Sequence, residues 1–103
     1  MELVTTFAAL GDPTRFAIVE RLLTRGALSA GQLLDVADIS APAISRHLKV
    51  LRQAGLIRQA VDKQHRIYSV EPGAVKSISA WTLNHEAFWN SGLDRLAAAL
   101  DEE

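Results

Sequence analysis

The chain has 103 residues, of which 49% are hydrophobic and 22% are charged, a composition typical of one small globular domain. It has no cysteine, which excludes disulfides, thiolate metal sites and thiol redox sensing. No apolar run approaches the roughly 18 residues that a membrane-spanning helix needs, and residues 1–4 lack the basic start of a secretory signal. We therefore expect a cytoplasmic protein without a membrane partner.

Positive charge is concentrated in one quarter of the chain. The net charge is only −1, yet residues 41–66 hold six lysines and arginines and a single aspartate. The rest of the chain holds five basic and eleven acidic residues. Such a segment is suited to bind a polyanion, although chance clustering on a solvated surface would give the same counts.

Three helices are predicted in the N-terminal third. Residues 2–10 are apolar enough for a first, short helix. Asp12 is a suitable cap and Pro13 a suitable first residue for the second helix, which we expect to end near Gly26. Residues 29–32, Ser-Ala-Gly-Gln, match a capping box and predict that a short third helix begins there.

A fourth helix is predicted after residues 37–40. Ser40 suits its N-cap, Pro42 is tolerated in its first turn, and Gly55 suits its left-handed end. Its apolar residues recur at the spacing of one buried face, and they are Ile44, Leu48 and Leu51. Its other face carries only cations and uncharged hydrogen-bonding residues, namely Ser45, Arg46, His47, Lys49, Arg52 and Gln53.

The remaining elements are a hairpin and a terminal helix. Residues 56–61 and 66–70 are short and rich in β-branched or aromatic residues, which predicts two strands. Residues 62–65 between them lack an Asn-Gly or Asp-Gly pair, so the sequence leaves the turn type open. Residues 74–100 predict a helix with a bend at 90–92, where Asn, Ser and Gly meet.

Together these elements predict a mostly α-helical fold with a small β-hairpin wing, in the order four helices, two strands and one helix. The short third helix, the turn and the fourth helix form a helix-turn-helix, and the hairpin makes the unit a winged helix. Such units place their second helix in the major groove of DNA. Phosphates would repel an acid on that helix, which accounts for its acid-free face. We expect one domain over residues 1–103 and double-stranded DNA as its partner.

The expected DNA contacts lie on the fourth helix and the hairpin. Arg46 suits a bidentate bond to guanine, while Lys49 and Arg52 suit attraction to phosphates. His47 has an alternative role, which is to pack beside the turn, and Arg15 is expected to be structural. The complete set of expected contacts is Ser40, Ala41, Ala43, Ser45, Arg46, His47, Lys49, Arg52, Lys63, His65 and Arg66.

Three segments of the sequence resemble the ArsR family of bacterial winged-helix repressors. They are ALGDPTRFAIVERL at 9–22, SAPAISRHLKVLRQAGLI at 40–57 and HRIYSV at 65–70. The resemblance implies a homodimer that represses transcription and releases its operator when a signal arrives. Two-fold symmetry then predicts an inverted-repeat operator, and an unidentified small-molecule effector is one form the signal can take.

The C-terminal segment is the expected dimer interface. Its large apolar residues follow helical spacing, and the helix-turn-helix already uses most of the core that one chain can build. By resemblance, family dimers pair through their first and last helices, which adds two residues of the first helix. The expected interface residues are Leu3, Phe7, Trp81, Phe88, Trp89, Leu93 and Leu96.

By resemblance, two metal sites known in the family are expected to be missing, and we expect no cofactor. The thiolate site would lie at residues 32–38, where Leu34 and Val36 stand in place of ligands. The site on the last helix would have only His85 and Glu86, and adjacent helical residues point about 100° apart. Neither pattern predicts a chelate.

Two other function classes compete with DNA binding. A winged helix used only for protein contacts remains the alternative, although the cations Arg46, Lys49 and Arg52 favour DNA. An enzyme is not expected, because Ser45 and His47 do not face each other on a helix and the sequence has no phosphate-binding loop or nucleophile elbow.

Overall fold

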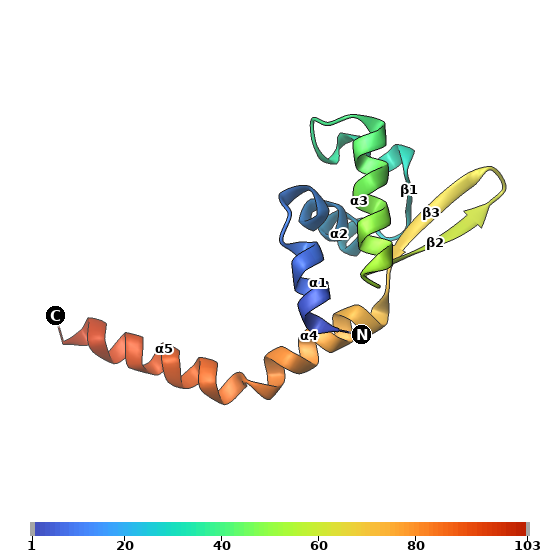
Figure 1. Cartoon of the computed structure of the whole chain (residues 1–103). Helices are drawn as coiled ribbons and strands as arrows, with labels where there is room; N and C mark the ends of the chain where they lie inside the picture. The colour runs from blue at the N-terminus through green and yellow to red at the C-terminus, as the bar shows by residue number, and fades with distance from the viewer. Residues whose placement is uncertain (1, 103) are drawn as a thin grey trace.

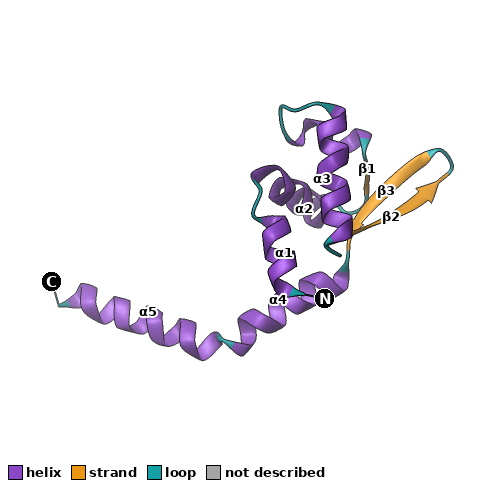
Figure 2. Ribbon diagram, viewed as in Figure 1, coloured by secondary structure: helices purple, strands orange, loops and turns teal. Residues whose placement is uncertain are grey.

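The computed structural model describes residues 2–102 (Figures 1 and 2). Its elements are α1 (Leu3–Leu10), α2 (Pro13–Arg25), β1 (Leu28–Ser29), the 3₁₀ helix η1 (Gly31–Val36), α3 (Ala41–Gln53), β2 (Ile57–Asp62), β3 (His65–Val70), α4 (Pro72–Asn84) and α5 (Glu86–Asp101). The mostly helical fold with a hairpin after the helix-turn-helix is confirmed.

The helix ends follow the local signals in the sequence. Asp12 Oδ2 accepts a hydrogen bond from the backbone N–H of Arg15 at 3.0 Å, which caps α2. Ser40 Oγ accepts from the backbone N–H of Ala43 at 3.3 Å, which caps α3. Gly55 has a φ of 77° just beyond α3, a conformation that costs glycine little.

One apolar core joins the helix-turn-helix to the sheet. Helices α2, η1 and α3 each contribute buried residues from one face. These residues are Ile18, Val19, Leu22, Leu33, Ile44, Leu48 and Leu51. The loop after α3, the hairpin and α4 add Leu56, Ile57, Tyr68 and Ala74. This core covers one face of α3, and the opposite face is exposed to solvent.

The third predicted helix is a 3₁₀ helix, and a short strand that was not predicted precedes it. The capping box is present, since Ser29 Oγ accepts from Gln32 N–H at 3.2 Å and Gln32 Oε1 accepts from Ser29 N–H at 2.9 Å. Leu28 and Ser29 pair with β3, so the sheet has three antiparallel strands in the order β1-β3-β2. A segment this short, tied to a strand at its start, favours the tighter 3₁₀ turn.

The hairpin closes through a two-residue turn. Asp62 pairs with His65, which leaves Lys63 and Gln64 at the tip. Lys63 has a φ of 59°, the only positive value at a non-glycine residue within residues 2–102. The turn is therefore tight although its sequence lacks glycine.

The C-terminal segment is two helices, and the predicted bend at 90–92 is wrong. The break lies at His85, whose Nδ1 lies 2.8 Å from the Trp81 carbonyl oxygen and must donate to it. In a continuous helix the backbone N–H of His85 would use that carbonyl, but here it bonds Thr82 at 3.2 Å. Gly92 stays inside α5.

Helix α5 stands away from the body of the molecule (Figure 1). It contains no buried residue, and its leucines at 93, 96 and 100 are 57–64% exposed. The radius of gyration is 17.5 Å, whereas a compact chain of this length has about 13 Å. Among residues 2–102, none of the helices has both the length and the apolarity of a membrane span.

Candidate nucleic-acid interface

The exposed face of α3 is cationic and free of acids. The core side of this helix is almost fully buried, whereas Ser45, Arg46, Lys49 and Arg52 are exposed. Within the described part of the chain, these three cations have no carboxylate within 4.0 Å. Their charges are therefore free to meet an anionic partner.

The wing supplies a second group of exposed cations. The exposed residues at or next to the hairpin tip are Lys63, His65 and Arg66, as expected for contacts with the DNA backbone. Arg58, nearer the base, donates from Nε to Ser69 Oγ at 3.2 Å across the two strands. Figure 1 shows α1 on one side of α3 and the hairpin on the other.

The N-terminal end of α3 offers small residues for close approach. Ser40 and Ala41 are exposed and Ala43 is half-buried, so the helix begins at an accessible surface. The Ser40 hydroxyl accepts from the Ala43 N–H as a cap, which satisfies one of the unpaired N–H groups of the first turn. This is the end that a helix-turn-helix directs at base edges.

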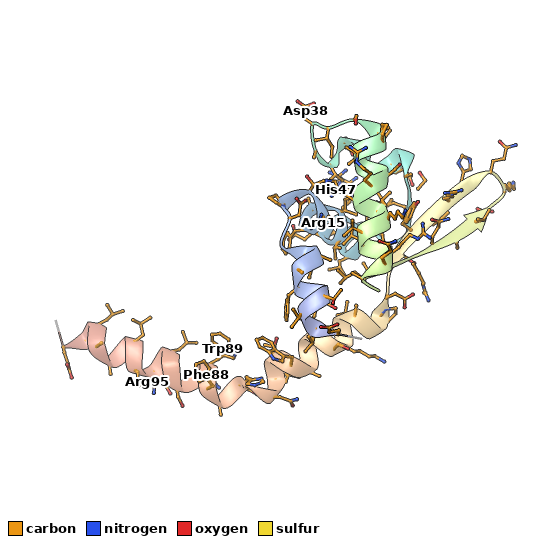
Figure 3. All side chains as sticks on the ribbon, viewed as in Figure 1. Arg15, Asp38, His47, Phe88, Trp89 and Arg95 are labelled. Carbon is orange, nitrogen blue, oxygen red and sulfur yellow. The ribbon has the colours of Figure 1, made fainter. Side chains whose placement is uncertain are left out.

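His47 differs from its neighbours because it turns toward the start of α2 (Figure 3). Its Nδ1 lies 3.4 Å from Arg15 Nη1 and 3.9 Å from Asp12 Oδ2, and its side chain is 24% exposed. Arg15 Nε also donates to the Ala9 carbonyl at 2.7 Å, which confirms that Arg15 has a structural contact. The geometry favours the packing alternative for Nδ1 of His47, whereas Nε2 makes no hydrogen bond within residues 2–102.

The carboxyl group of Asp12 is stabilised in its charged form at this junction. The hydrogen bond from the Arg15 backbone N–H has the largest effect and lowers the pKa of Asp12, against an opposing effect of burial. The nearby charges of His47 and Arg15 lower the pKa further. The sequence did not predict this cluster, because Arg15 and His47 are 32 positions apart.

Comparison with known proteins identifies the regulator class of this fold. Residues 10–60 match a family model described as a helix-turn-helix domain. The HTH-type transcriptional regulator Rv2034 of Mycobacterium tuberculosis is 38% identical, over 92% of this chain and 85% of that protein. The transcriptional repressor SdpR of Bacillus subtilis is 37% identical, over 84% of this chain and 91% of that protein.

Solved structures agree with the sequence relatives. A crystal structure of an ArsR family transcriptional regulator has a TM-score of 0.75 and 30% identity, covering 85% of this chain and 96% of that one. An ArsR-like transcriptional regulator from Rhodococcus sp. RHA1 has a TM-score of 0.71 and 29% identity, covering 97% and 90%. The chain belongs to the ArsR family.

As an ArsR-family member, the protein is a DNA-binding transcriptional regulator and not an enzyme. α3 is the second helix of its helix-turn-helix, the position of a recognition helix, and the β2–β3 hairpin is its wing. Within residues 2–102 no group of three or more His, Cys, Asp or Glu side chains is placed to hold a metal ion. His85 Nδ1 donates to the Trp81 carbonyl at the break between α4 and α5, so this nitrogen is not available as a metal ligand.

Proposed function

We propose that this regulator is a cytoplasmic homodimer that represses transcription from an inverted-repeat operator. The observation that carries the proposal is the acid-free, exposed cationic face of α3 next to an exposed cationic wing. Similarity to SdpR, which is named a transcriptional repressor, supports repression. An unidentified small-molecule effector would release the operator.

The proposed contacts divide between base reading and backbone attraction. Arg46 reads a guanine edge in the major groove through two N–H donors. Lys49 and Arg52 attract phosphates, and Lys63 and Arg66 do the same from the wing. The remaining contacts proposed on α3 and the wing are Ser40, Ala41, Ala43, Ser45, His47 and His65.

The proposed dimer covers the apolar surface that one chain leaves exposed. Phe7 of α1 packs edge-to-face on Trp81 of α4 with ring centroids 5.6 Å apart, so the two elements share one aromatic surface. On α5, Phe88, Trp89 and Leu93 add further apolar surface and are 48–64% exposed. Leu3 and Leu96 complete the proposed interface. A surface this apolar on a chain this small is suited to a second copy.

Footprinting on the promoter of the protein's own operon tests the proposal. We expect two protected half-sites related by a dyad, with centres about one or two helical turns apart. Affinity should fall steeply as salt rises, because bound phosphates release counterions. Lys49→Gln should reduce both affinity and salt dependence, whereas the matched control Lys76→Gln on α4 should change neither. Binding without a dyad, or equal effects of the two variants, would count against the proposal.

A further inference from the structure

Arg15 connects the end of α1 to the recognition helix. Its Nε donates to the Ala9 carbonyl at 2.7 Å, and its Nη1 lies 3.4 Å from Nδ1 of His47. Figure 3 shows the Arg15 and His47 side chains close together between α2 and α3. A guanidinium group has only donors, so Nδ1 must be the acceptor in this contact.

The contact with Arg15 selects one tautomer of His47. A neutral imidazole that accepts at Nδ1 carries its hydrogen on Nε2. Asp12 Oδ2 is 3.9 Å from the same Nδ1, too far for a hydrogen bond, and it already accepts from the Arg15 backbone N–H at 3.0 Å. Arg15 therefore holds the ring at Nδ1, and Nε2–H has no hydrogen-bond acceptor among residues 2–102.

We propose that Arg15 is a positioning residue for DNA recognition, which holds His47 as the Nε2–H tautomer so that Nε2 donates to an acceptor on DNA. The inference rests on the proposed contact between α3 and DNA. Phosphate oxygens and purine N7 atoms accept hydrogen bonds and do not donate them. In the other tautomer, Nδ1–H would face the N–H groups of Arg15, so two donors would meet. Its unprotonated Nε2 could not donate to these DNA acceptors.

The tautomer is measured on the free protein. Two-bond ¹H–¹⁵N correlation spectra at about pH 8 distinguish a protonated from an unprotonated ring nitrogen. The His47 signals are those that disappear in His47→Gln. We expect protonated Nε2 in the wild type and a mixture of tautomers in Arg15→Ala. A wild-type Nδ1–H tautomer overturns the inference, and this result is independent of whether the protein binds DNA.

A matched pair of variants tests the donor at Nε2. Glutamine places its amide nitrogen near the position of Nε2, whereas asparagine places it near Nδ1. On a duplex selected from a random pool by the wild-type protein, we expect His47→Gln to bind nearly as well as wild type and His47→Asn about tenfold more weakly. Equal affinities of the two variants would exclude the donor role.

A double-mutant cycle tests whether Arg15 acts through His47. We expect Arg15→Ala to weaken binding about tenfold in the wild type and little in the His47→Gln background, where no tautomer needs to be fixed. The same loss in both backgrounds would show that Arg15 acts independently. Circular dichroism checks that Arg15→Ala folds; if it does not, the wild-type tautomer and the Gln–Asn pair decide the question.

Discussion

Arg46 and Lys49 lie on the same exposed face of α3, but their chemistry differs. A guanidinium can make two parallel hydrogen bonds to one guanine, whereas an ammonium is a point charge that suits any phosphate. We predict that Arg46→Ala weakens operator binding by about 1–3 kcal/mol and binding to a scrambled duplex much less. Lys49→Ala should weaken both alike. Fluorescence anisotropy on the two duplexes measures this, and equal losses for Arg46→Ala would assign Arg46 to phosphate.

Asp12 links acid stability to the cap of α2. Its pKa lies below the usual value of 3.8, chiefly because its carboxylate accepts the Arg15 N–H. A group with a lowered folded pKa stabilises the fold fully above its unfolded pKa and loses that contribution as pH falls through the folded value. We predict that below about pH 4 the wild-type melting temperature falls more steeply than that of Asp12→Asn, which caps without titrating. Parallel curves in thermal melts would contradict this account.

At the scale of elements, the His85 side chain lies at the break between α4 and α5. His85 uses the Trp81 carbonyl that its own backbone N–H would need in a continuous helix. We predict that His85→Ala joins α4 and α5 and raises the helical signal in circular dichroism. Gly92→Ala is the matched control, since a Cβ there meets no atom within 4 Å and adds helix propensity without touching the break. A break that persists in amide NMR of His85→Ala would assign it to another cause.

The sequence predicts an element well when the interactions that form it join residues close together in the chain. The caps at Asp12 and Ser40 involve residues three positions apart, so the sequence predicts them directly. Strand β1 has two residues and exists only through its pairing with β3, which no local pattern indicates. The exposed cations of the site were predicted from helical periodicity, but the inward turn of His47 depends on Arg15, which only the folded chain brings near.

At the scale of the whole molecule, a single chain is elongated, and α5 has no packing partner within residues 2–102. Its extents are 61 × 28 × 22 Å, and the long dimension comes from α5 extending beyond the core (Figure 1). An isolated helix of this length is marginal in water, so packing of its apolar face must stabilise it. Trp89, Leu93, Leu96 and Leu100 fall within about 60° of one another around the helix. This stripe defines the face that a second copy would cover.

The stripe makes a specific prediction about assembly. We predict that Trp89→Ala weakens the dimer by about 2 kcal/mol or more, because a large aromatic residue at the centre of an interface contributes most of its binding energy. Ser91→Ala, on the opposite face of α5, should leave the dimer unchanged. Sedimentation equilibrium over a concentration series measures both dissociation constants. Since two-fold operator binding requires two recognition helices, Trp89→Ala should also lose the protection of paired half-sites while one half-site still binds weakly. A Trp89→Ala protein that stays dimeric would place the interface elsewhere.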